Sequence, residues 1–172
     1  MVFSLERSLC GCNDCVRNYL RASSTCVSQL AELQKAKHMK YGQGDATYQA
    51  AGGESGIRQL VDHFYDIMAQ DHPRIFSWHP DDNEASRDKL ASFLCGWMGG
   101  PRRYHEKYGP ISIPGVHAHL AVDAAARDEW LACMSKALSE MGYPEEFKDY
   151  LLTQLAVPAE YIRQATEANL SQ

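Results

Sequence analysis

Apolar residues recur at helical spacing through most of the sequence after residue 52. Between Gly56 and Gln70, one helical face would carry six large apolar or aromatic side chains, namely Ile57, Leu60, Val61, Phe64, Tyr65 and Met68. Comparable stripes follow three further helix starts, near Asp81, at Asp123 and at Pro144, and no segment reads as a convincing strand. The spacing therefore predicts an all-α fold of crossed helices.

Residues at the ends of these segments predict where the helices begin and end. Ser55 is expected to cap the first helix and Asp123 the helix that carries Trp130, since short polar side chains accept the free N–H groups of a first turn. Pro158 is expected to kink or split the last helix, because proline lacks a backbone N–H. Residues 101–115 contain several Gly and Pro breaks and little periodicity, which predicts a long loop of a kind that often carries function.

The cysteines divide the chain near residue 47. Four of the six lie close to the start, at Cys10, Cys12, Cys15 and Cys26. We therefore expect a partly helical extension over 1–47, with its best helix at 27–39, and one globular domain over 48–172. Cys95 and Cys133 stand in apolar helical surroundings, and we expect them to be buried as small hydrophobic residues.

The early cysteines leave two interpretations open. Four thiols can bind zinc or an iron–sulfur cluster, and such a centre can sense metals or oxidants. The spacing Cys-x-Cys-x-x-Cys with Cys26 further on lacks the second close pair that zinc sites usually show, so a solvated, reducible tail is the other interpretation. The helix at 27–39 is in turn a candidate for association with a partner or with a second copy, as in a homodimer.

The charge and hydropathy patterns exclude several classes of partner. The formal net charge is −5 and the basic residues are scattered, which argues against nucleic acid and anionic membranes. No apolar run approaches the roughly 20 residues that cross a bilayer. The opening residues MVFSLERSLCGC place Glu6 and Arg7 where a signal peptide would need an apolar core, so we expect a cytoplasmic protein.

His117 stands between the Gly- and Pro-rich segment and the helix of Trp130. A histidine in such a place is more often structural than a metal ligand. Two features favour a ligand: the segment leaves the backbone free to present an imidazole, and the predicted helices supply many aromatic side chains. We expect His117 to bind a haem iron. His119 is the competing ligand, but a loop that leads into a helix lets only one of the two point inward.

Tyr65 and Trp130 form a second candidate pair. Both are readily interpreted as core aromatics. A buried phenol O–H and a buried indole N–H nevertheless need acceptors, and a dioxygen ligand with partial negative charge would accept from both. On the neighbouring helix Leu90 is expected to point inward, while Lys89 near the rim is either a partner of a haem propionate or a solvated surface lysine.

Several motifs together resemble the group II truncated haemoglobins. They are Gly52–Glu54, Leu60–Met68, GGPRRY at 99–104 followed by 106–109, His117, and RDEWLACM at 127–134. The match runs from about Tyr48 to Tyr161. It implies a small two-over-two helical sandwich around b-type haem, preceded by an N-terminal extension that has no counterpart in the family.

The resemblance also implies roles for single residues. By the motif match His117 falls at the proximal iron ligand, Tyr65 at the distal tyrosine and Trp130 at the tryptophan typical of the group. The other implied haem contacts are Trp78 at the distal edge, Ser86 in place of a distal histidine, Leu90 and Phe93 in the pocket wall, and Lys89 and Tyr104 at the propionates. Val116 and His119 depart from the family, whose members often have Arg and Pro there.

These residues predict a haem protein that binds dioxygen and other diatomic ligands. Slow release would suit redox chemistry, such as nitric oxide dioxygenation or peroxide reduction with an unidentified electron donor, better than oxygen transport. The alternative is a sensor in which the early thiols modulate the haem domain. A resting state in which His79 or Tyr65 also binds the iron is open as well.

Overall fold

The computed structural model describes residues 41–170, and these residues belong to one compact unit. The predicted helix at 27–39 and the four early cysteines lie outside the described residues. Within residues 41–170 there is no strand, and the helices are α2 (Ala46–Ala50), α3 (Gly53–Asp71), α4 (Pro73–Phe76), α5 (Glu84–Trp97), α6 (Arg103–Tyr108), α7 (Ile113–His117), α8 (Ala124–Glu140) and α9 (Glu145–Leu170). None of them is long and apolar enough to cross a lipid bilayer.

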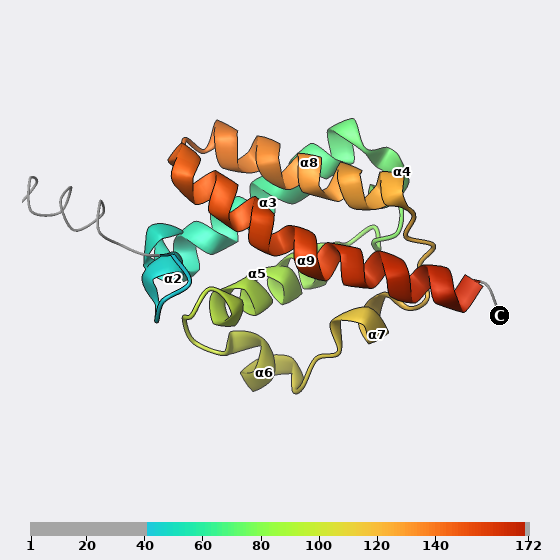
Figure 1. Ribbon diagram of the computed structural model, residues 1–172, viewed down its shortest axis with the longest axis horizontal. Helices are drawn as coiled ribbons and strands as arrows, with labels where there is room; N and C mark the ends of the chain where they lie inside the picture. Colours follow the sequence, from blue (N-terminus) through green and yellow to red (C-terminus); the bar gives the residue numbers. More distant parts are fainter. Residues whose placement is uncertain (1–40, 171–172) are drawn as a thin grey trace, which may run out of the picture. The chain divides into compact units, whose positions relative to one another are not determined.

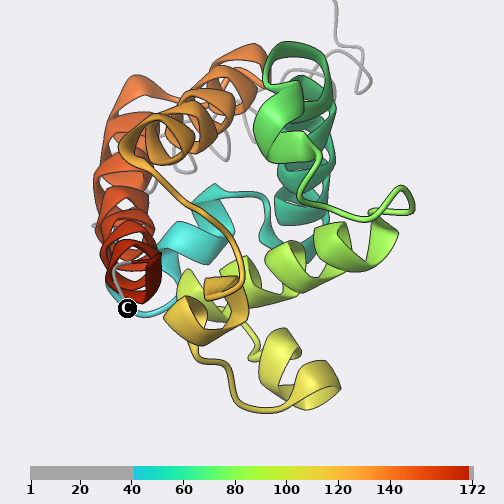
Figure 2. The same ribbon diagram turned by 90° about the vertical axis from the view of Figure 1, so that its right-hand side faces the viewer.

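Four long helices, α3, α5, α8 and α9, make the framework (Figure 1). Helix α3 packs against both α5 and α8, and α8 packs against α9. The pair α3–α5 therefore meets the pair α8–α9, which is a two-over-two arrangement. Figure 2 shows these helices from the end where α7 and the connection to α8 lie. The short helix α2 precedes α3, and α4, α6 and α7 lie in the connections between the long helices.

Helix α3 buries the predicted face but begins earlier than predicted. Its six predicted inward residues are all buried: Ile57, Leu60, Val61, Phe64, Tyr65 and Met68. The helix starts at Gly53 after Gly52, whose φ of 86° turns the chain. Ser55 consequently lies inside the first turn and does not cap it. The hydroxyl of Tyr48 accepts the N–H of Glu54 at 3.0 Å instead, so a residue from α2 satisfies one of the free donors.

The helix that carries Trp130 is capped as predicted. Asp123 Oδ1 accepts the N–H of Ala126 at 2.7 Å. Gly142, with φ 74°, follows the end of this helix and turns the chain into α9. The predicted buried thiols are also confirmed, since Cys95 and Cys133 are both buried and free.

Helix α9 continues through Pro158, so the prediction that it splits there is wrong. Proline removes one backbone hydrogen bond from the helix, and the packing of α9 against α8 and α7 offsets this loss. Leu155 is buried in the first half of the helix. In the second half the hydroxyl of Thr166 donates to the carbonyl of Val122 at 3.1 Å, which holds this half to the chain before α8.

The predicted loop at 101–115 contains helical structure and is therefore only partly a loop. Helix α6 lies inside it and α7 begins within it. Each is too short to show a period in sequence. At α7 the side chain of Ser112 accepts the N–H of Gly115 at 3.3 Å, and Pro114 occupies the first turn, where a missing N–H costs little.

Candidate functional site

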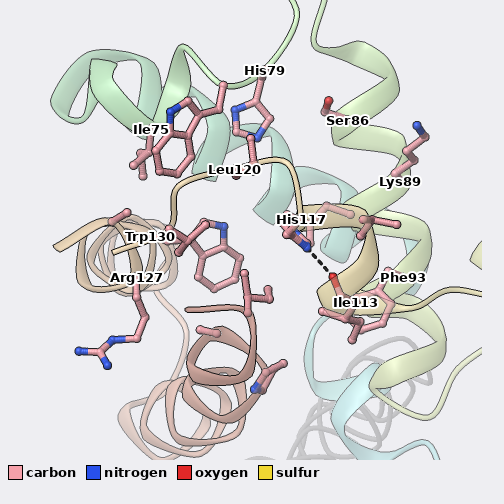
Figure 3. A pocket seen from close by; sticks show the side chains of 18 of the residues that line it. Ile75, His79, Ser86, Lys89, Phe93, Ile113, His117, Leu120, Arg127 and Trp130 are labelled. Carbon is pink, nitrogen blue, oxygen red and sulfur yellow. Dashed lines mark hydrogen bonds between the residues drawn. The ribbon is translucent and has the colours of Figure 1, made fainter. Parts of the chain in front are cut away.

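A cavity of about 470 Å³ opens between the long helices and α7. Its size is typical of sites for small organic ligands. Every site residue predicted from the sequence lines it: Tyr65, Trp78, Ser86, Lys89, Leu90, Phe93, Tyr104, His117 and Trp130. Figure 3 shows these walls from close by, with His79, His117, Phe93 and Trp130 coming from different elements. The fold thus gathers residues from positions 65 to 130 at one cavity.

His117 is the last residue of α7, and its ring is fixed within that helix. The ring Nδ1 lies 2.7 Å from the carbonyl oxygen of Ile113 (dashed in Figure 3). Because a carbonyl only accepts, Nδ1 carries the proton and donates it. The lone pair of Nε2 is then free for a metal, as is usual when the other ring nitrogen donates to a backbone carbonyl. His119 is exposed and also borders the cavity.

Tyr65 presents a neutral phenol to the cavity. The residue is only 5% exposed, and burial raises the pKa of Tyr65 to about 12, while the guanidinium of Arg87 acts in the opposite direction. The phenol is therefore protonated at neutral pH and able to donate. Among the described residues, Tyr65 makes no hydrogen bond to a protein acceptor through its hydroxyl.

Trp130 faces the cavity from α8. Its ring meets Phe64 edge to face at 5.1 Å between centroids, which fixes the indole against α3. Its N–H likewise has no protein acceptor within residues 41–168. An indole nitrogen can only donate, so Trp130 and Tyr65 bring two unpaired donors to the same cavity.

His79 adds a further imidazole to the cavity wall. Its ring lies edge to face with Tyr65 at 5.1 Å between centroids, and its Nδ1 is 3.2 Å from the carbonyl oxygen of Phe76. Burial lowers the pKa of His79, and nearby His117 acts in the same direction. His79 is thus favoured in its neutral form, with Nδ1 donating and Nε2 without a proton.

The rim of the cavity carries polar groups. Lys89 is exposed, and its Nζ lies 5.7 Å from the ring centroid of Tyr108. Tyr104 is half-buried on α6. Arg127 also lines the cavity, but its guanidinium is paired with Glu160 of α9 at 2.5 Å.

Several wall residues were not predicted from the sequence. They are apolar and come from the short helices, the connections and the far half of α9: Ile75, Ile111, Ile113, Leu120, Val122, Ala159 and Ile162. Most of their segments are too short or too irregular to show a helical period. The far half of α9 was not expected to line a site, because the helix was expected to kink or split at Pro158. The one available signal was that these residues are apolar.

This donor set fits a haem. One imidazole brings a free nitrogen for the iron, apolar walls suit the macrocycle, and an exposed lysine with a tyrosine at the rim suits the propionates. Two unpaired donors remain for a ligand on the iron. The fold and the cavity together define a haem-binding globin.

Comparison with known proteins shows which family of globins this chain resembles. The bacterial-like globin family matches residues 46–164. The group 2 truncated haemoglobin YjbI of Bacillus subtilis is 32% identical over 124 residues, which span 72% of this chain and 92% of that protein. The solved group II 2-on-2 haemoglobin of Agrobacterium tumefaciens shares 29% identity with a TM-score of 0.64, over 68% of this chain and 92% of that one.

A truncated oxygen-avid haemoglobin from Bacillus subtilis shares 31% identity with a TM-score of 0.63, over 67% of this chain and 97% of that one. The chain belongs to the group II truncated haemoglobins, and its cofactor is haem iron. The predicted family, the all-α two-over-two fold and the haem cofactor are therefore confirmed.

Proposed function

We propose that this globin holds a diatomic ligand through Tyr65 and Trp130 and uses it in redox chemistry, either nitric oxide dioxygenation or peroxide reduction, rather than in oxygen transport. The observation that carries the proposal is the pair of donors, a phenol O–H and an indole N–H, that line one cavity without protein acceptors. Both residues line the cavity and neither donor is used by a protein acceptor among the described residues, so both groups are available to an acceptor that arrives with the ligand.

The roles of the chain's residues follow from their geometry. When bound, the haem iron supplies the position at which the diatomic ligand attaches and the electrons that pass to it. His117 holds the group through Nε2, because its Nδ1–H is committed to Ile113. Phe93 and Leu90 supply apolar wall that keeps water away, and Lys89 and Tyr104 at the rim hold the propionates.

The two donors are strong enough to change the lifetime of the bound state. A hydrogen bond of this kind contributes about 1–2 kcal/mol, which slows escape roughly 5- to 30-fold for each donor. Slow release opposes transport but leaves time for a second reactant to enter. The description of the similar Bacillus subtilis protein as oxygen-avid supports a tightly held ligand here.

The two proposed reactions require electrons from outside the protein. Nitric oxide and dioxygen combine to nitrate with the uptake of a single electron, and peroxide is reduced to water with two electrons and two protons. Either turnover needs an external electron donor, whose identity the sequence leaves open. Tyr65, as a protonated phenol, also lies where it can hold a proton near the ligand.

The test combines release and turnover. In the haem-reconstituted protein, Tyr65→Phe and Trp130→Phe are each expected to speed dioxygen release about 5- to 30-fold in stopped-flow measurements. The parent protein should convert added nitric oxide to nitrate in a single turnover. If the parent releases dioxygen as fast as the double variant, the two donors do not hold the ligand. If it also forms no nitrate and does not consume peroxide, the redox role is wrong.

A further inference from the structure

Tyr65 lies against the guanidinium of Arg87, a residue of α5. The Arg87 Cζ is 5.2 Å from the centroid of the Tyr65 ring. The side chain of Arg87 is only 14% exposed, so this contact is largely shielded from water. A cation close to the face of an aromatic ring is attracted by the ring's negative face, and more strongly when it is desolvated.

Arg87 is itself held by polar partners on α3 and at the residue that precedes α5. Its Nη1 donates to the carbonyl oxygen of Asp62 at 2.7 Å, its Nη2 to Asp66 Oδ1 at 2.7 Å, and its Nε to Asn83 Oδ1 at 2.8 Å. Asp62 and Asp66 flank Tyr65 on α3. The planar guanidinium is thus fixed by the same turns of α3 that carry the tyrosine.

The remaining contacts of the Tyr65 ring leave it little freedom. Phe64 lies edge to face with it at 5.3 Å between centroids, and His79 does so at 5.1 Å. With Arg87 these residues surround the ring, so the direction of the hydroxyl depends on them. The positive charge also favours a strongly polarised O–H, in agreement with its effect on the pKa of Tyr65.

We infer that Arg87 is a positioning residue for the ligand-binding hydroxyl of Tyr65. The inference rests on the proposed function, in which Tyr65 donates to the ligand. Arg87 acts through the tyrosine: it fixes the orientation of the ring and strengthens the O–H as a donor. Arg87 thereby couples α5 to the ligand side of the cavity.

Arg58 provides a matched control for a merely structural role. It also joins α3 to α5, since its guanidinium bonds Asp62 at 2.9 Å and Glu84 at 2.8 Å. Neither arginine is among the residues that line the cavity, but Arg58, unlike Arg87, has no ring contact with Tyr65. Arg58→Leu therefore removes a comparable link between the helices and leaves the tyrosine untouched.

The experiment uses the full chain reconstituted with haem. Arg87→Leu is expected to speed dioxygen release about 2- to 5-fold. In the carbon monoxide complex, it should raise the frequency of the infrared C–O stretching band or broaden that band. Arg58→Leu should change neither the release rate nor the band. Arg87→Lys should restore part of the effect, since it keeps the charge but loses the planar fork. Haem stoichiometry and circular dichroism verify that each variant is folded and loaded.

A double-mutant cycle separates the possible failures. In a Tyr65→Phe background, Arg87→Leu should change neither release nor the infrared band, because no hydroxyl remains to be positioned. Equal effects of Arg87→Leu in both backgrounds, or an effect of Arg58→Leu as large as that of Arg87→Leu, would overturn the inference. If Tyr65→Phe alone leaves release unchanged, the proposed function fails at its first step, whatever Arg87 does.

Discussion

The ring of His117 donates through Nδ1 to the carbonyl oxygen of Ile113, one turn earlier in α7, at 2.7 Å. This bond selects the tautomer of the imidazole and orients the ring on a short helix. His119, two residues later, has no corresponding bond among the described residues. The difference gives a reason, beyond the family resemblance, to propose His117 as the iron ligand.

The first prediction therefore concerns these two histidines. His117→Ala should abolish the absorption spectrum of histidine-ligated haem, and added imidazole should restore it by occupying the vacated space. His119→Ala is the control and should keep the parent spectrum. A parent-like ferrous spectrum in His117→Ala without imidazole would show that another residue binds the iron.

The second prediction concerns pH. Because burial raises the pKa of Tyr65 to about 12, its phenol stays protonated across the neutral range. The dioxygen release rate of the parent should therefore show no step from Tyr65 between about pH 6 and pH 10. Tyr65→Phe should raise the rate by the same factor across this range. A parent rate that rises toward the rate of Tyr65→Phe below pH 10 would mean that the phenol ionises in that range.

The third prediction concerns acid stability. Hydrogen bonds from Arg163 and Arg127 hold the pKa of Glu160 well below its usual range. A depressed carboxyl pKa contributes stability above the unfolded pKa of about 4.3, and this contribution is lost as the pH falls through the folded value. Glu160→Gln should therefore lower the melting temperature at pH 7, and the two proteins should converge as the pH falls below about 4.

Glu145 offers the control for this experiment. Its side chain is 80% exposed and pairs with Lys148 within α9, whereas Glu160 joins α9 to Arg127 of α8. Exposed pairs of this kind contribute little to stability. Glu145→Gln should change the melting temperature less than Glu160→Gln does at pH 7. Equal shifts would show that the link between α8 and α9 adds nothing.

The fourth prediction compares two glycines with positive φ. Gly99 has φ 91°, and a Cβ there would lie 1.9 Å from the carbonyl oxygen of Gly44. Gly109 has φ 78° and open space around it. Gly109→Ala should cost about 1–3 kcal/mol from the backbone conformation alone, because φ 78° with ψ −162° is a region that essentially only glycine adopts. Gly99→Ala should cost more, on the order of 4 kcal/mol, in urea unfolding, because the segment at Gly44 must move.

The long helices could be predicted because their signals are local. A period of 3.6 residues marked the buried face of α3, and an aspartate at the right place marked the start of α8. The candidate site was largely predictable as well, because motifs that resemble one family brought its residue types together. All nine candidate residues do line one cavity, while their roles in binding stay predictions.

The remaining features depend on contacts that no local pattern encodes. Helix α7 is too short for periodicity, so the bond from His117 to Ile113 was not foreseeable. The passage of α9 through Pro158 depends on packing against two other helices. The contact of Arg87 with Tyr65 joins residues 22 positions apart on different helices, and only the packing of α3 on α5 brings them together.

The burial of Cys95 and Cys133 affects how readily peroxide can oxidise their thiols. Burial raises the pKa of Cys133 to about 11 and raises that of Cys95 as well. At pH 7 only about one Cys133 side chain in 10⁴ is then a thiolate, the form that peroxide converts to sulfenic acid. Among residues 41–168, the cysteine thiols should therefore resist oxidation by peroxide. Peroxide is also the reactant that the proposed chemistry would consume.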